Sequence, residues 1–247
     1  MEIIIAADRA EMGQLAAELA TRLLSDAIRQ RGSARLIVAT GSSQFEVLDG
    51  LVASKDIDWT KVDAFHLDEY IGIDAQHPAS FCRYLKERFV DRVPLRSFHF
   101  LDGTKDPDIV CKLAGEALTR APVDVAMIGI GENGHLAFND PPADFETKEP
   151  YIQVELDIPC RMQQVGEGWF KDLAAVPTHA ISMSIQQILL SKNIICSVPD
   201  ERKADAVHRA LHGPIDPLLP ASILRNHSST TLLLDQASAK LLDQQGA

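Results

Sequence analysis

The feature that most constrains the fold of this chain is a regular alternation of short apolar runs with longer segments of helical period. The apolar runs are typical of buried strands, and the segments between them gather apolar side chains on one helix face. This alternation predicts an α/β fold, in which a mainly parallel sheet carries helices on both faces. The predicted strands are residues 3–6, 36–39, 62–67, 97–101, 123–128, 152–156, 193–198 and 230–234, and the predicted helices are residues 10–31, 45–52, 79–90, 109–118, 181–190, 203–211 and 236–242.

Composition limits the kind of protein and its partners. With 247 residues, 46% of them hydrophobic, the chain can bury one large core, so we expect a single domain over residues 1–247. A net charge of −11 disfavours binding to nucleic acid or anionic membranes, although a local positive pocket for a small anion remains compatible with it. The chain shows neither a signal peptide nor an apolar run long enough to span a membrane. We therefore expect a cytoplasmic protein.

The four cysteines are Cys82, Cys111, Cys160 and Cys196, and no two of them form a CxxC pair. Most of them lie inside apolar or amphipathic stretches. We interpret them as reduced packing residues of a cytosolic protein, which predicts no zinc site built from thiols.

The segment from residue 123 to residue 142 joins an apolar strand to a glycine-rich turn that carries His135 and Asp140. Gly129, Gly131 and Gly134 let the backbone turn tightly and approach a ligand. Buried parallel strands place chemistry at their carboxyl ends, so we expect His135 to face a crevice there. The least regular stretch, residues 141–159, is the best candidate for a mobile flap over this site.

Other interpretations of this glycine-rich turn remain open. Its glycines match GxGxxG, but a dinucleotide site needs the turn to open a helix, and Pro141 and Pro142 follow too soon. A metal site that combines His135 and Asp140 with His66 or Asp68 lacks any supporting spacing. A purely structural His135 is a further alternative.

A second segment, residues 36–48, leads from a strand through Thr40, Ser42 and Ser43 into a helix. Free N–H groups and the positive dipole end at a helix start, together with hydroxyl donors, suit a phosphate group. The alternative is ordinary capping of the helix by Ser42 or Ser43.

A third segment, residues 62–72, ends a strand in a charged cluster that contains Asp68 and Glu69. A carboxylate that is partly shielded from water can take a proton from carbon, so Asp68 is the candidate base. The alternative is a capping or turn carboxylate.

A fourth segment, residues 194–208, places Arg202 and Lys203 at the start of a helix, where cations oppose the helix dipole. This placement predicts an anion that the two cations meet. The alternative is a solvated surface lysine.

Taken together, the motifs around Asp68, Gly129–Asp140 and Lys203 resemble the glucosamine-6-phosphate deaminase/isomerase family over nearly the whole chain. The Ala-Phe-Asn that follows His135 separates this group from the related 6-phosphogluconolactonases, whose motif looks like GHxASLFP. The resemblance implies a Rossmann-like α/β sandwich. It also implies a small phosphosugar substrate and no metal or redox cofactor.

The resemblance also implies roles for individual residues. Asp68 matches the base that moves a proton between C2 and C1, and His135 matches the ring-opening histidine. The remaining assignments place Asn133 and Asp140 beside His135 in catalysis, and Thr40, Gly41, Ser42, Ser43, Lys203, Glu69, Gly134 and Arg161 in binding the substrate or its phosphate. The typical deaminase has aspartate at the position of Asn133 and glutamate at that of Asp140, so the charge around His135 is altered.

We therefore expect an enzyme that converts glucosamine 6-phosphate to fructose 6-phosphate and ammonia. The alternatives are a 6-phosphogluconolactonase-like hydrolase, an isomerase for another phosphosugar such as galactosamine 6-phosphate, and a non-catalytic sugar-phosphate sensor. A homo-oligomer is a further expectation.

Overall fold

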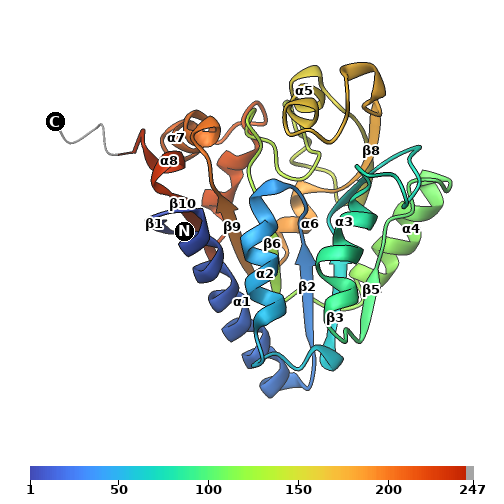
Figure 1. Cartoon of the computed structure of the whole chain (residues 1–247), viewed down its shortest axis with the longest axis vertical. Coiled ribbons are helices and arrows are strands. Elements are labelled where there is room, and N and C mark those ends of the chain that lie inside the picture. The colour runs from blue at the N-terminus through green and yellow to red at the C-terminus, as the bar shows by residue number, and fades with distance from the viewer. Residues whose placement is uncertain (243–247) are drawn as a thin grey trace.

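The computed structural model describes residues 1–242, and within them a seven-stranded parallel sheet forms the centre of the molecule (Figure 1). The strand order is β1-β10-β9-β6-β2-β3-β5, and every neighbouring pair is parallel. The strands are β1 (Glu2–Ala6), β2 (Ala34–Val38), β3 (Val62–His66), β5 (Ser97–His99), β6 (Val125–Ile128), β9 (Asn193–Val198) and β10 (Thr230–Asp235). The predicted α/β fold with a mainly parallel sheet is confirmed.

Helices cover both faces of the sheet because alternate strand residues point to opposite sides. In β2, Leu36 and Val38 join the core under one group of helices, whereas Ile37 joins the core on the other face. The first group is α1 (Arg9–Arg31), α2 (Phe45–Ala53) and α3 (Phe81–Arg88), and the other face carries α4 (Pro107–Leu118), α6 (Ile185–Leu189), α7 (Ala204–His212) and α8 (Gln236–Ala239). None of the helices described is both long and apolar enough to cross a membrane.

A second, antiparallel sheet was not predicted. It has the order β4-β8-β7, with β4 (Asp68–Tyr70), β8 (His179–Met183) and β7 (Tyr151–Glu155). The prediction of one helix over residues 181–190 is therefore wrong at its start. Residues 180–183 are all buried and β8 pairs with both β4 and β7, as suits a central strand, and Ser184 then caps the short helix α6.

The stretch predicted as an irregular flap, residues 141–159, contains more regular structure than expected. Residues 141–150 form neither helix nor strand, but β7 follows, and α5 (Ile158–Gly166) begins before the stretch ends. The Asp157 side chain caps α5 by accepting from the N–H of Cys160. Figure 1 shows α5 above the carboxyl end of the sheet.

The other predicted helices are present, with ends that differ by up to two residues, except that α8 is shorter than the predicted 236–242. The polar tail beyond Leu242 lies outside the described residues. Short 3-10 helices complete the structure: η1 (Ser42–Gln44), η2 (Trp59–Lys61), η3 (Val90–Arg92), η4 (Leu173–Ala175), η5 (Glu201–Lys203) and η6 (Pro220–Asn226).

The order of the strands fixes where a ligand can bind. From β2 the chain proceeds to β3 and β5 on one side of the sheet, whereas β6, β9 and β10 follow on the other side. The carboxyl ends of the neighbours β2 and β6 therefore flank a topological switch point, where open α/β sheets have their crevice.

Candidate active site

A pocket opens at this switch point, and most of its walls come from the loops after β2, β3, β6 and β9. Its other walls come from α5 and from the first residues of α1, β4 and α3. The residues that line it are Arg9, Ala39, Thr40, Gly41, Ser42, Ser43, Leu67, Asp68, Phe81, Gly129, Ile130, Gly131, His135, Ala137, Phe138, Gln163, Gln164, Glu167, Pro199, Asp200, Arg202 and Lys203. Seven of the predicted site residues are among them: Thr40, Gly41, Ser42, Ser43, Asp68, His135 and Lys203.

The loop after β2 has the geometry of an anion cradle. Gly41 adopts a φ of 95°, a left-handed conformation that favours glycine, and the hydroxyl of Tyr84 fixes the loop by donating to its carbonyl oxygen. Neither η1 nor α2 has a side-chain cap, so Ser42 and Ser43 do not cap these helices. Their hydroxyls can donate to a ligand, that of Ser43 while it accepts from Nε2 of Gln44, and the N–H groups at the helix start add further donors.

Lys203 adds a buried positive charge to the same pocket. Its residue surface is only 6% exposed, and its ammonium group makes no ion pair with any residue from 1 to 242. Burial is the main cause that lowers its pKa. A buried cation without a partner is costly, so this arrangement favours an anionic ligand.

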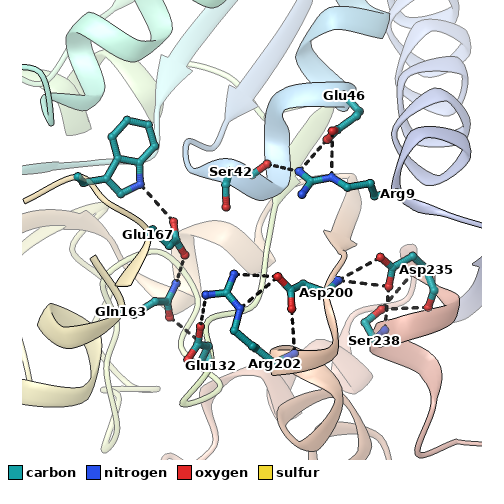
Figure 2. A network of polar contacts seen from close by, with 11 residues as sticks. Arg9, Ser42, Glu46, Glu132, Gln163, Glu167, Asp200, Arg202, Asp235 and Ser238 are labelled. Carbon is teal, nitrogen blue, oxygen red and sulfur yellow. Dashed lines mark hydrogen bonds and ion pairs between the residues drawn. The ribbon is translucent and has the colours of Figure 1, made fainter. Parts of the chain in front are cut away.

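Arg202, beside it, behaves differently. Its guanidinium group pairs with Asp200 at 2.8 Å and with Glu132 at 3.2 Å, at the mouth of the pocket. Figure 2 shows that this network continues to α5, because the Gln163 side chain accepts from the N–H of Glu132 and donates to Glu167. The network joins the loops after β6 and β9 to α5.

Arg9 lies on the opposite rim, where it donates to the backbone carbonyl of Ser42 and to Glu46 (Figure 2). It therefore supports the loop after β2. Arg9, Gln163, Gln164 and Glu167 were not predicted from the sequence as pocket residues. The Asp157-Ile-Pro sequence, an N-cap followed by a proline in the first turn, was a signal for α5.

Asp68 lies at the start of β4, in the floor of the pocket. Its Oδ1 is buried and has no hydrogen-bond partner among the residues described, so the turn or cap role considered from the sequence is not observed. Burial, followed by the nearby charge of Glu69, raises the pKa of Asp68 well above its usual range. A carboxylate with a raised pKa is a stronger base, as proton abstraction from carbon requires.

His135 is held between Asp140 and the pocket. Its Nδ1 lies 3.0 Å from Oδ1 of Asp140, and its Nε2 packs over Gly131, where an added Cβ would come within 2.3 Å of it. Only glycine at position 131 leaves room for the ring. One nitrogen is therefore directed to a carboxylate and the other adjoins the pocket.

Asn133 and Asp140 do not line this pocket, but they support the histidine. Asn133 accepts from the N–H of His135 and donates through Nδ2 to Asp140, while the N–H of Asp157 donates to the other Asp140 oxygen. Burial acts to raise the pKa of Asp140, but the contacts with His135, Asn133 and Asp157 outweigh it, and the pKa is lowered. Asp140 is thus held in its charged form beside His135.

Three other predicted binding residues lie outside the pocket lining. The Glu69 carboxylate accepts hydrogen bonds at the start of α3, from the backbone N–H groups of Phe81 and Cys82 and from the hydroxyl of Ser80. Arg161 donates to the backbone carbonyls of Leu173 and Val176, and Gly134, with a φ of 87°, turns the chain beside Leu219. The structure thus places Glu69, Gly134 and Arg161 in supporting positions.

The comparisons with known proteins cover nearly the whole chain. A family model described as glucosamine-6-phosphate isomerases/6-phosphogluconolactonase matches residues 7–233. The glucosamine-6-phosphate deaminase of Clostridium acetobutylicum is 32% identical over 249 residues, which cover 98% of this chain and 100% of the relative. That of Streptococcus thermophilus is 33% identical over 243 residues, with the same coverage.

Solved structures give the same similarity. A monomeric glucosamine-6-phosphate deaminase has a TM-score of 0.88 and 28% identity, covering 98% of this chain and 100% of that one. A 6-phosphogluconolactonase from Trypanosoma brucei has a TM-score of 0.81 at 16% identity, covering 98% of both chains, which shows a shared fold only.

Proposed function

Because this chain belongs to the glucosamine-6-phosphate isomerase/6-phosphogluconolactonase family, we propose that its pocket converts glucosamine 6-phosphate to fructose 6-phosphate and ammonia. The observation that carries the proposal is that Asp68, His135 and Lys203, from three distant segments, line one pocket. They supply a base, a proton-transfer group and an anchor for a phosphate. The close relatives that are named glucosamine-6-phosphate deaminase support the choice of substrate.

The phosphate of the substrate binds first. Lys203 provides the charge, and Thr40, Ser42 and Ser43 provide hydroxyl donors beside the start of α2. A phosphate at this place receives both charge-assisted hydrogen bonds and the favourable end of the helix dipole. The binding energy from this remote group holds the sugar carbons in position for the reaction.

His135 then opens the sugar ring. Opening a pyranose moves the proton of the C1 hydroxyl away and delivers a proton to the ring oxygen, so the catalyst must both accept and donate. An imidazole can both accept and donate a proton, and the Asp140 carboxylate at Nδ1 holds the ring in position.

Asp68 performs the isomerisation. It takes the proton from C2 of the open aldehyde while O1 gains a proton, which gives an enolamine. It then returns the proton to C1 as the amine loses one, which leaves a hydroxyl at C1 and an imine at C2. Water then adds to C2, the C–N bond breaks, and ammonia leaves with the keto sugar phosphate as the other product. The first of these transfers needs a strong base, as the raised pKa of Asp68 supports.

The test is to incubate the purified protein with glucosamine 6-phosphate and to measure ammonia and fructose 6-phosphate together. We expect both products in equal amounts, and none from a His135→Ala variant. Parallel assays with galactosamine 6-phosphate and 6-phosphogluconolactone compare the alternatives. Hydrolysis of the lactone by the Asp68→Ala variant, without deamination by the native protein, would favour a lactonase, and phosphosugar binding without turnover would favour a sensor.

Two further expectations belong to this proposal. Four free cysteines fit a reducing compartment such as the cytoplasm. The homo-oligomer remains a prediction, and one similar solved structure is described as monomeric.

A further inference from the structure

We propose that His135, Asp140 and Cys160 form a binding site for a borderline-soft divalent cation, best matched by Zn²⁺, and that an ion bound there switches the enzyme off. The cation site depends only on these three side chains. Its inhibitory effect rests on the proposed function, because His135 and Asp140 are the pair assigned to ring opening.

The geometry suits one ion. A nitrogen of His135, a carboxylate oxygen of Asp140 and the sulfur of Cys160 all lie within 4.8 Å of one another. Zinc binds nitrogen and oxygen at about 2.0 Å and sulfur at about 2.3 Å, which places tetrahedral ligand atoms about 3.3–3.5 Å from one another. Separations of up to 4.8 Å reach this spacing when the side chains close by about 1 Å. Three protein ligands leave the fourth tetrahedral position to water.

The donor set selects the kind of metal. Imidazole, carboxylate and thiolate together suit Zn²⁺, whereas Mg²⁺ and Ca²⁺ bind oxygen ligands. Cys160 is 1% exposed, and Nδ1 of His135 is buried without an aligned hydrogen bond to any described residue, although Asp140 lies 3.0 Å away. A buried nitrogen in that position gains a partner when a cation enters.

The site is already organised by its neighbours. Cys160 lies in the first turn of α5, fixed by the side chain of Asp157. Asn133 and the backbone N–H of Asp157 hold the two oxygens of Asp140. Such outer partners orient metal ligands and strengthen binding. The spacing of the three ligands matches no metal-binding motif, which is why the sequence predicted no thiol zinc site.

A second cavity opens beside the active site, and we assign it as the entrance for the ion. It is lined by Asn133, Pro159 and Gln163 among others, and it adjoins the ligands because Asn133 donates to Asp140 and Pro159 precedes Cys160. On binding, the Cys160 thiol releases its proton to solvent and the sulfur bonds to the metal. The ion then binds Nδ1 of His135 and the carboxylate of Asp140. The pair can no longer open the sugar ring, so the enzyme stops.

The test is a titration of the metal-free protein with Co²⁺, whose bond to a thiolate gives a near-ultraviolet charge-transfer band, while Zn²⁺ affinity is measured by competition. We expect one equivalent of Co²⁺ to produce the band. Cys160→Ser should abolish the band and weaken Zn²⁺ binding by more than the roughly 10- to 100-fold that loss of an outer partner costs. Cys111→Ser, which removes a partly exposed cysteine on α4, is the matched control and should keep both.

The activity of the same samples separates this proposal from the proposed function. We expect metal-free enzyme to deaminate glucosamine 6-phosphate, Zn²⁺ to inhibit it, and a chelator to restore it. A Co²⁺ band that persists in Cys160→Ser overturns the metal site even if the enzyme is active. Zn²⁺ binding by a native protein that shows no Co²⁺–thiolate band overturns it as well. A Cys160-dependent band in a protein without turnover would instead leave the metal site standing and reject the deaminase.

Discussion

Nδ1 of His135 and Oδ1 of Asp140 lie 3.0 Å apart, in the turn that follows the central strand β6. Asp140 is itself held by Asn133 and by the backbone of Asp157, so the carboxylate has a fixed direction. The histidine therefore has one nitrogen for orientation and one for chemistry.

Replacing Asp140 with Asn should lower kcat for deamination by about 10- to 100-fold while KM changes little, because the imidazole loses a charged partner and the phosphate contacts remain. Steady-state kinetics with glucosamine 6-phosphate measure both constants. The control is Asp144→Asn, an exposed carboxylate that accepts backbone hydrogen bonds in the next loop. Equal kcat values for the two variants would contradict the role of Asp140.

The pH dependence should identify the base. Because the pKa of Asp68 is raised by burial and by Glu69, its carboxylate forms only at a pH above the ordinary aspartate range. We expect the acid limb of kcat/KM to lie above that range and to be absent from the residual rate of Asp68→Asn. Asp140, in contrast, has a lowered pKa. An acid limb below the ordinary aspartate range would therefore point to Asp140 as the base and contradict the role of Asp68.

Because Asp68 is buried, its charged form should lower the free energy of unfolding. A carboxyl whose folded pKa is raised contributes most to stability below its unfolded pKa, and this contribution is lost as pH rises through the folded pKa. Asp68→Asn should therefore stabilise the protein at neutral pH by about 1 kcal/mol, or about 2–4 °C in Tm. Thermal unfolding at several pH values measures the difference, which should shrink as pH falls. A variant that is less stable at neutral pH would be inconsistent with an unpaired buried carboxyl.

Lys203 should act through the phosphate. Its replacement by Ala removes one charge-assisted hydrogen bond, worth about 1.5–3 kcal/mol, and should raise KM roughly 10- to 100-fold. Inorganic phosphate should lose its ability to inhibit competitively. Lys192→Ala is the matched control, because Lys192 precedes β9 at the opposite edge of the sheet and pairs there with Asp124. A similar KM for the two variants would remove Lys203 from the phosphate site.

Glu69 should prove structural, in contrast to the binding role expected from the sequence. Its carboxylate accepts hydrogen bonds from the N–H groups at the start of α3 and from Ser80. Glu69→Gln should cost about 1–3 kcal/mol of unfolding free energy, because a buried acceptor is replaced by an amide with unmatched donors. Urea denaturation checks this value, and KM should stay close to that of the native enzyme. A large KM effect at unchanged stability would restore the binding role.

The sequence predicted the main sheet and the principal pocket loops because these depend on local patterns. Apolar runs that end in glycine, serine or charged residues mark strands and the loops after them, and Ser42, Asp68 and His135 all follow such runs. Parallel strands bring those ends to one edge of the sheet. The order of strands along the sequence was therefore enough to predict that the loops carrying Ser42, Asp68 and His135 lie close together.

What the sequence did not predict depends on tertiary partners. Residues 181–183 have apolar content that fits helix or strand, and their pairing with β4 and β7 decides for a strand. Glu69 faces α3 because N–H and hydroxyl donors lie there. Arg161 faces two backbone carbonyl oxygens that accept from it, and neither set of partners can be read from the local sequence. The pocket wall of α5 was missed because its glutamines carry no motif.

The most direct measurement is a crystal structure of Asp68→Asn, which should bind without turnover, soaked with glucosamine 6-phosphate. We expect the phosphate against Ser42, Ser43 and Lys203, with C1 and C2 beside residue 68 and the ring oxygen within hydrogen-bond reach of Nε2 of His135. A sugar bound elsewhere, or one that contacts residue 68 and His135 through unrelated ends of the molecule, would contradict the proposed mechanism.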